Sequence, residues 1–159
     1  MKAVKYLVLS FVAAATLTAC DKEYNAPEAL RSDFDKMYPT AVDVEWEKRG
    51  EYAVAEFHIP GEGDCEAWYK NEVWVASEYD IQFKNLPDAV QSAFLTAYGV
   101  ETPVDDVDRL ERPNKDDVYF IEAEIYLNDN IADIYLDYNA SGELLRSSVE
   151  VEPTIYYYL

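Results

Sequence analysis

The sequence predicts an α+β protein in which a unit of one helix and a four-stranded antiparallel sheet occurs twice in tandem. Two observations predict this fold. Residues 27–38 (PEALRSDFDKMY) recur at 87–98 as PDAVQSAFLTAY, and both segments have the apolar spacing of a helix. After each segment the hydrophobic period changes from 3.6 to 2, which is typical of half-buried strands. We therefore expect a first unit over residues 27–82 and a second over 83–152, packed together because units this small are marginal alone.

Each expected helix has a matching start and end. A proline followed by an acidic residue, at Pro27 and Pro87, suits the first turn, and Pro39 and Gly99 lie just past the ends, where helix-terminating residues belong. One face of each helix is apolar: Leu30, Phe34, Met37 and Tyr38 in the first, and Val90, Phe94, Ala97 and Tyr98 in the second. These faces are expected to cover the sheets.

The expected strands follow each helix in order, separated by turn residues such as those at 60–63 and 128–130. Alternation predicts strands over 42–47, 53–59, 66–70 and 73–79 in the first unit, and over 104–110, 118–127, 131–138 and 144–151 in the second. Trp46 falls on the apolar side and is expected in the core. The tyrosine-rich residues 153–159 are expected to form either a loose aromatic tail or an added edge strand.

The first nineteen residues are expected to be a processing signal. Lys2 and Lys5 precede an apolar run from Tyr6 to Ala15 that is too short to span a bilayer. Leu17-Thr18-Ala19-Cys20 resembles the bacterial lipobox, which implies cleavage before Cys20 and acylation of its sulfur; the alternative is an ordinary secretory signal. Several acyl chains together would hold the protein firmly. We expect export across the inner membrane, a lipid anchor at Cys20 in the outer membrane, on its periplasmic or surface-exposed side, and a short tether over 20–26.

The charge balance restricts the partners. The chain has 13 lysine and arginine residues against 32 aspartate and glutamate residues, and loss of Lys2 and Lys5 takes the net charge from −19 to about −21. Nucleic acid is excluded, because lysine and arginine contacts to phosphate dominate that kind of binding. Anionic headgroups would repel the chain, so only the anchor is expected to hold it at the membrane. Neutral or cationic partners are favoured, although acidity for solubility alone is an equal interpretation.

The sequence predicts no catalytic residue and no cofactor. His58 is the only histidine and is expected to be a surface or half-buried strand residue, on the face opposite Phe57. If Cys20 is acylated, Cys65 is the only thiol left, and the neighbouring acids should raise its pKa, so that it acts as a small inert apolar residue. Acidic residues are numerous, but alternation places them toward solvent rather than in a desolvated cleft.

No metal site is predicted either. Residues 137–142 imitate the first half of an EF-hand loop, but Ser148 stands where a bidentate glutamate is required, so a hairpin turn is favoured. Asp105, Asp106 and Asp108 could hold a cation weakly, without regular metal-site spacing.

Three aromatic residues are the candidate partner-binding residues. Trp68 alternates with Glu66 and Lys70, while Tyr126 and Tyr135 fall in the acidic register of their own strands. We expect the three rings to point away from the helix-covered face, toward water, where aromatic anchors commonly bind proteins. The alternative is that they stack across neighbouring strands.

Short motifs give a family resemblance over most of residues 27–151. They are Tyr38-Pro39, Val44-Glu45-Trp46-Glu47, Ala55-Glu56-Phe57, Glu66-Ala67-Trp68-Tyr69 and Leu86-Pro87-Asp88-Ala89-Val90. With these the chain resembles the PepSY-like, beta-lactamase-inhibitor-protein-like (BLIP-like) proteins of Bacteroidetes, departing from their pattern at 69–74. The resemblance implies a tandem helix-plus-sheet fold, an envelope location, a binding or inhibitory role and no catalytic residues.

The function predicted from the sequence is that of a cell-envelope lipoprotein that binds a protein or peptide of the envelope, inhibition included, and that is not an enzyme. Two alternatives stay open. One is an envelope hydrolase that uses a pair of acidic residues. The other is an acidic structural lipoprotein that binds cations.

Overall fold

The computed structural model describes residues 24–127, 130–149, 155 and 158–159. Its helices are α1 (Glu28–Met37) and α2 (Asp88–Tyr98), with a short 3-10 turn, η1 (Phe83–Asn85), before α2. The strands are β1 (Val42–Arg49), β2 (Tyr52–Ile59), β3 (Gly63–Lys70), β4 (Val73–Asp80), β5 (Val104–Glu111), β6 (Val118–Leu127), β7 (Asn130–Asn139) and β8 (Leu144–Val149). The positions of the helices and strands predicted from periodicity are therefore confirmed within this part of the chain.

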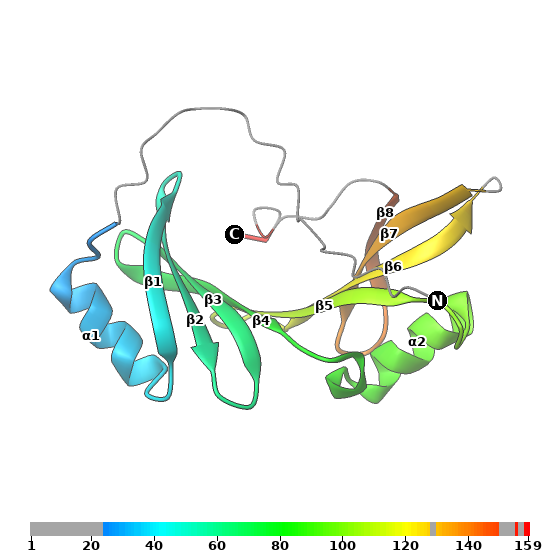
Figure 1. Cartoon of the computed structure of the whole chain (residues 1–159), viewed down its shortest axis with the longest axis horizontal. Coiled ribbons are helices and arrows are strands. Elements are labelled where there is room, and N and C mark those ends of the chain that lie inside the picture. Colours follow the sequence, from blue (N-terminus) through cyan, green and yellow to red (C-terminus); the bar gives the residue numbers. More distant parts are fainter. Residues whose placement is uncertain (1–23, 128–129, 150–154, 156–157) are drawn as a thin grey trace, which may run out of the picture.

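The predicted fold class is wrong. All eight strands form one antiparallel sheet in the order β1 to β8, so the protein is mostly β with two short helices (Figure 1). The join is made by β4 and β5, which pair from Ser77 opposite Glu111 to Asp80 opposite Asp108. Two separate four-stranded sheets would each leave an open edge at this point, and pairing these edges satisfies their backbone groups. Alternation along a strand is the same whichever strand lies beside it, so the sequence pattern could not distinguish the two arrangements.

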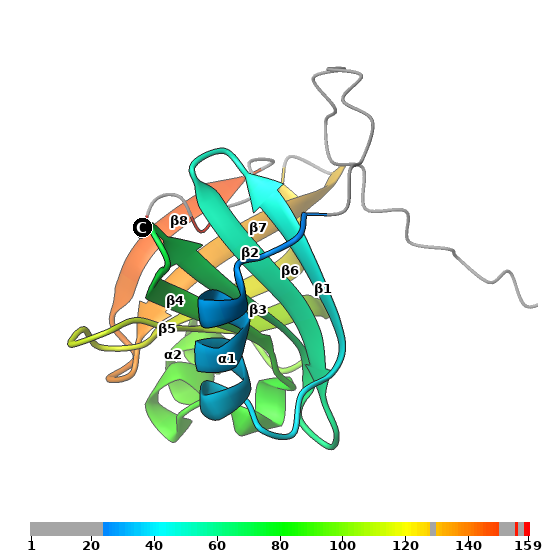
Figure 2. The ribbon, with the colours of Figure 1, turned by 90° about the vertical axis from the view of Figure 1, so that its left-hand side faces the viewer.

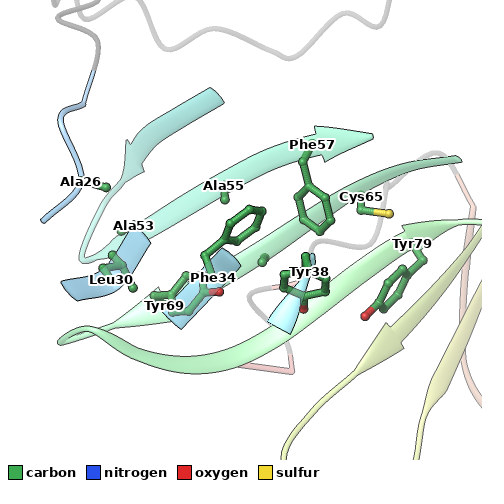
Figure 3. Close-up of a cluster of buried hydrophobic side chains, with 11 residues drawn as sticks. Ala26, Leu30, Phe34, Tyr38, Ala53, Ala55, Phe57, Cys65, Tyr69 and Tyr79 are labelled. Carbon is green, nitrogen blue, oxygen red and sulfur yellow. The ribbon is translucent and has the colours of Figure 1, made fainter. Parts of the chain in front are cut away.

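Both helices lie on the same side of the sheet, α1 against its first half and α2 against its second (Figures 1 and 2). Under α1, Phe34 meets Phe57 edge to face, with ring centroids 4.9 Å apart, and Trp46 at 5.5 Å (the cluster is drawn in Figure 3). Trp46 is partly buried against this cluster, as the apolar register predicted. A second cluster lies between α2 and the sheet, and it includes Phe94 of the helix and Leu136 of β7. Each helix thus buries the centre of its predicted apolar face, whereas Met37 of α1 and Ala97 of α2, which were expected on the same faces, are exposed.

The turn between β7 and β8 lies against the start of α2. Asn139 forms the turn with its own side chain, since Oδ1 accepts hydrogen bonds from the backbone N–H groups of Ser141 and Glu143 at 3.0 and 3.1 Å. Gly142 follows at φ +81°, and a Cβ atom at this position would lie 2.4 Å from the carbonyl oxygen of Ala89. The prediction of a hairpin turn within residues 137–142 is confirmed.

The opposite face of the sheet carries a third apolar cluster. It contains Tyr52, Val54, Trp68, Ala76, Leu110, Val118, Phe120 and Ile155, so it reaches from β2 to β6 across the join. Of the predicted tail, Ile155 is buried, and Tyr158 and Leu159 are partly buried against the cluster. The Tyr158 hydroxyl also donates a hydrogen bond to the buried Asp137, whose Oδ2 accepts a second one from Arg146 Nε at 2.8 Å. These terminal residues are therefore neither a loose tail nor part of a strand.

Residues 1–23, with the predicted signal and Cys20, lie outside the described residues. Within the described ranges, no helix has the length and apolar character needed to cross a membrane.

Candidate functional site: an acidic groove on the open face of the sheet

A groove of about 1200 Å³ lies on the face of the sheet that the helices leave open. We call it the acidic groove. Its lining comes from β1 to β7 and from Ile155, and consists of Asp43, Glu45, Glu47, Arg49, Glu56, Phe57, His58, Asp64, Cys65, Glu66, Trp68, Glu78, Asp80, Asp106, Asp108, Phe120, Ile121, Glu122, Tyr135 and Ile155. Strand alternation explains the composition, because most of the apolar residues face the helices and their acidic neighbours face the groove.

The register of the strands aligns like charges across the groove. Glu45 of β1 lies opposite Glu56 of β2, Glu56 opposite Glu66 of β3, and Glu66 opposite Glu78 of β4. We call these four residues the glutamate row. Like charges directly opposite each other destabilise a sheet. A row of four is therefore a cost to folding that the packing of the sheet does not require.

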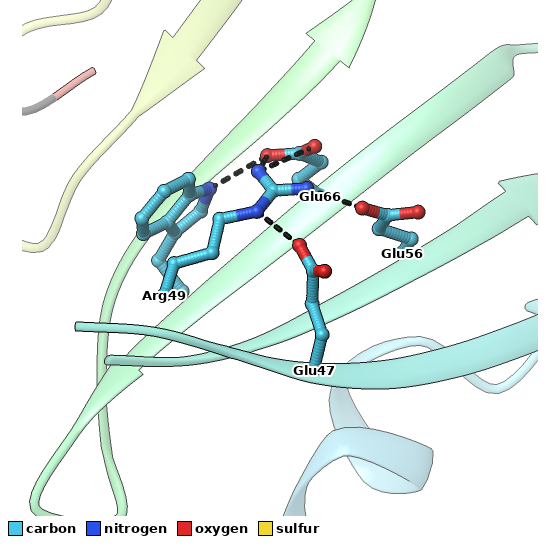
Figure 4. Close-up of polar contacts among 5 residues, drawn as sticks. Glu47, Arg49, Glu56 and Glu66 are labelled. Atoms are coloured by element: carbon cyan, nitrogen blue, oxygen red, sulfur yellow. Dashed lines mark hydrogen bonds and ion pairs between the residues drawn. The ribbon is translucent and has the colours of Figure 1, made fainter. Parts of the chain in front are cut away.

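Arg49 offsets part of this cost (Figure 4). Its Nη1 donates to both carboxylate oxygens of Glu66, at 2.8 and 2.9 Å, and its other nitrogens donate to Glu47 and Glu56. The guanidinium lies 5.2 Å from the Trp68 ring centroid, and Trp68 Nε1 donates to Glu66 Oε2 at 3.0 Å. Burial by itself would lower the pKa of Arg49, but Glu66 and Glu47 raise it. The arginine is thus a fully ionised cation that is already shared among three glutamates.

Asp108 is the most perturbed carboxyl group of the groove. Part of the residue remains accessible, but protein surrounds its carboxylate closely enough that burial raises its pKa well above the usual range. Repulsion from Asp106, Glu78, Asp80 and Glu66 adds to this effect. Among the described residues, no side chain forms a hydrogen bond or ion pair with Asp108. Its charge therefore has no compensating group among the residues that the structure describes.

Replacing Asp108 with asparagine is expected to stabilise the protein at neutral pH. The folded state holds the proton of Asp108 more tightly than the unfolded chain, where an aspartate has a pKa of about 3.9. The free energy of unfolding therefore falls as the pH rises from about 4 through the folded-state pKa, and Asp108→Asn removes that fall. Thermal unfolding at pH 7 should show a gain of about 1 kcal/mol or more, shrinking toward zero near pH 4.

The matched control for this prediction is Asp35→Asn, which removes the same charge from an exposed position on α1. Its stability should follow that of the parent protein at both pH values. An equal gain in both variants would attribute the effect to the overall charge of the chain rather than to the environment of Asp108.

The three predicted partner-binding aromatics are found in different environments. Trp68 lies on the predicted face, but it is only 2% exposed, so the expectation that it points to water is wrong. Its ring packs against Tyr52 at 5.7 Å, as the stacking alternative expected. Tyr135 lines the acidic groove and is half-buried. Tyr126 is 82% exposed and lies outside the lining.

Arg49 was missed by sequence reasoning. It had one available signal, because it follows Glu45 and Glu47 in the groove-facing register as the single cation of that series. Asp108 was named only as one of three aspartates that could hold a cation weakly. Its environment had no signal in the sequence, because it is created by acids from β3 and β4 that the sheet brings beside β5.

His58 and Cys65 also belong to the groove lining. His58 is half-buried, as expected, and its Nδ1 lies 2.9 Å from Asp64 Oδ1. Cys65 is buried, and burial, followed by repulsion from Glu62 and Asp64, raises the pKa of its thiol to about 12, in agreement with the inert role expected for it.

The run of aspartates at 105–108 is divided by the strand. Asp106 and Asp108 line the acidic groove. Asp105 instead lies near Glu124 and Asp133, with one carboxylate oxygen of each residue within 4.8 Å of the others. Exposed acidic groups often approach in this way without binding a metal ion, so this cluster by itself does not identify a metal site.

Comparison with known proteins gives matches among solved structures alone, since neither a protein-family model nor a curated protein matches the sequence. A BLIP-like protein from Bacteroides fragilis NCTC 9343 shares 29% identity at a TM-score of 0.71, over 84% of this chain and 94% of that one. A DUF2874 family protein from Bacteroides ovatus ATCC 8483 shares 27% identity at 0.69, over 79% and 89%. The chain is similar to BLIP-like proteins.

The BLIP-like similarity agrees with the resemblance carried by the sequence motifs, whereas the PepSY-like relation and the lipid anchor stay predictions. A third structure, of a protein from Bacteroides eggerthii DSM 20697 predicted to be periplasmic, matches at 24% identity and a TM-score of 0.69, over 79% of this chain and 90% of that one. At this identity it shows the fold alone.

Proposed function

We propose that this BLIP-like chain is a protein-binding module of the cell envelope, without catalytic activity of its own, and that its partner binds in the acidic groove. The observation that carries the proposal is the groove itself. It is built from seven strands and crosses the join of the sheet, so it offers a broad surface rather than an enclosed pocket. Specific protein partners typically bury about 800 Å² on each side, which needs a surface of this kind.

The similar structures favour the same function. A BLIP-like protein and DUF2874 family proteins share the fold over most of their length. Inhibition of the partner and a lipid anchor at Cys20 belong to this proposal as well. Fold similarity does not identify the partner, so the partner must be identified by experiments on the groove residues.

Site-specific photo-crosslinking tests the location. A photoreactive residue in place of Glu45, which is exposed at the end of the glutamate row, should crosslink an envelope protein in intact cells. The same residue in place of Asp35, exposed on α1 outside the groove, should not. Crosslinking from Asp35 with none from Glu45 would place the binding surface on the helical side and contradict the proposal.

An envelope hydrolase is the second candidate, and Asp108 is the observation that favours it. A carboxyl group with a raised pKa beside a second carboxyl group, as Asp108 is beside Asp106, is the arrangement of a general acid with its base. The wide groove argues against it, because such catalysis depends on excluding water. A substrate screen with the parent protein and Asp108→Asn decides the matter: turnover that the variant loses would replace the binding proposal.

A further inference from the structure

Among its described lining residues, the acidic groove contains far more acidic than basic side chains. Eleven aspartate and glutamate residues line it, and Arg49 is the one lysine or arginine among its described lining residues. Arg49 is committed to Glu47, Glu56 and Glu66. The acids of β4 and β5 that face the second half of the groove, Asp80, Asp106 and Asp108, form no ion pair with any described residue. The surplus charge is therefore concentrated at the centre of the sheet.

These negative charges repel one another and so lower the stability of the fold. The glutamate row repeats a like-charge contact three times across four strands, and Asp80 lies directly opposite Asp108 at the join. Asp108 adds a carboxylate that is enclosed by protein and has no partner within the described residues. Neutral side chains would fill these positions without repulsion. Features that break local rules of stability in this way are typical of binding sites.

The protein's own Arg49 is an example of a cation held in the groove. Around Arg49, carboxylates accept hydrogen bonds from every nitrogen of the guanidinium, and the Trp68 ring lies 5.2 Å from it. Farther along the groove, Asp106 lies opposite Glu122 of β6, and Glu122 lies opposite the half-buried Tyr135 of β7. Tyr135 lines the groove, and its ring could pack against the aliphatic stem of a lysine or arginine side chain in the same manner.

We infer that the partner presents a segment with several lysine or arginine side chains, which enters the acidic groove and pairs with Asp80, Asp106 and Asp108. This inference rests on the proposed function and adds the chemistry of the partner to it. A basic segment matches the groove in charge, and its side chains are long enough to reach the enclosed Asp108 while its backbone stays at the surface. Binding would remove the repulsion that the free groove contains.

Titration calorimetry of the full chain with hexa-arginine amide tests the inference, with hexaglutamine amide as the neutral comparison. Hexa-arginine should bind and hexaglutamine should not. The double variant Asp80→Asn/Asp106→Asn should weaken binding of hexa-arginine at least tenfold, because two carboxylates that contact the cation are lost. The asparagine at 106 keeps the oxygen that accepts the backbone N–H of Val107 at 3.0 Å, so the strand should remain intact.

The matched control is Asp35→Asn/Glu101→Gln, which removes the same charge from exposed positions outside the groove. Its affinity should stay within twofold of the parent value at 150 mM salt, where distant charges are largely screened. Equal weakening in both double variants would mean that hexa-arginine responds to the net charge, and would overturn the inference. Calcium binding that hexa-arginine does not compete with, and that the groove variant abolishes, would identify a metal site instead and overturn it as well.

Proton release gives a second readout. Asp106 on its own strand, Asp80 and Glu78 on β4 and Glu66 on β3 all repel an ionised Asp108, whereas the neighbour on β6 is the uncharged Phe120. A bound cation favours the ionised form, so binding should release protons and tighten as the pH rises from 5 to 8. Calorimetry in buffers of different ionisation enthalpy should detect this release, and Asp108→Asn should abolish it.

The outcomes separate the inference from the function on which it rests. If the Glu45 crosslink persists in the presence of excess hexa-arginine, the groove binds a protein by other chemistry, so the inference fails and the proposed function stands. If no crosslink forms from Glu45 although hexa-arginine binds tightly, the groove is cation-selective, and the proposed function must be revised.

Discussion

Replacing Gly142 with alanine is expected to lower the free energy of unfolding by roughly 3 kcal/mol, from about 1 kcal/mol for the left-handed backbone and 1–3 kcal/mol for overpacking. Gly142 adopts φ +81°, and a Cβ atom there would lie 2.4 Å from the carbonyl oxygen of Ala89 and 2.8 Å from its carbon. These are backbone atoms of the first turn of α2, which cannot move without shifting the helix off the sheet. Urea unfolding of Gly142→Ala, followed by circular dichroism, measures the loss.

Gly50→Ala is the matched control for Gly142→Ala. Gly50 also has a positive φ, +63°, but no atom lies within 4 Å of the position of its Cβ. Alanine there should cost only the backbone contribution, about 1 kcal/mol. Equal losses at the two positions would mean that the turn between β7 and β8 does not press on α2, which would contradict the packing described here.

Replacing Phe94 with alanine is expected to cost about 3–5 kcal/mol and to lower the stability of the whole sheet, not of its second half alone. Phe94 is a residue of α2 that is 1% exposed and packs in the apolar cluster between this helix and the sheet. The pairing of β4 with β5, together with the apolar cluster that spans β2 to β6, couples the two halves. Unfolding should therefore remain a single cooperative transition.

The positions of the tryptophans make this coupling measurable. Trp46, Trp68 and Trp74 all lie in β1 to β4, so their fluorescence reports on the half of the sheet that Phe94 does not contact. In Phe94→Ala, the fluorescence transition in urea should shift together with the circular dichroism. Ser92→Ala, at an exposed position of α2, should shift neither by more than about 0.5 kcal/mol. A fluorescence transition that stayed at the parent midpoint would show two independently unfolding halves.

The predictions that concern binding depend on a different property of the same sheet. Asp108→Asn is expected to stabilise the protein and to abolish the proton release on binding. When the carboxylates of a binding site repel one another, removing one of them is expected to raise stability and to weaken binding. Charge in the acidic groove therefore connects the stability of this fold with its proposed role.

The sequence by itself determined the local structure. Apolar spacing of 3.6 placed α1 and α2, because a helix must bury one face, and alternation placed the strands and the side on which each residue lies. Trp46 was correctly placed on the apolar side, although it is only partly buried against the core, and the residues around Asn139 were correctly expected to form a turn. These features depend on a residue and its near neighbours along the chain, so their signal is present in any short window of the sequence.

Only the tertiary structure decided how the strands combine. Alternation states which way a side chain points, but not which strand lies beside it, so the pairing of β4 with β5 had no local signal. That pairing turned two expected sheets into one and placed Asp80 opposite Asp108. Trp68 became buried because the third apolar cluster, with Ile155 from the end of the chain, assembled over it. The acidic groove exists because electrostatic repulsion and burial act through space, between residues that the sequence separates.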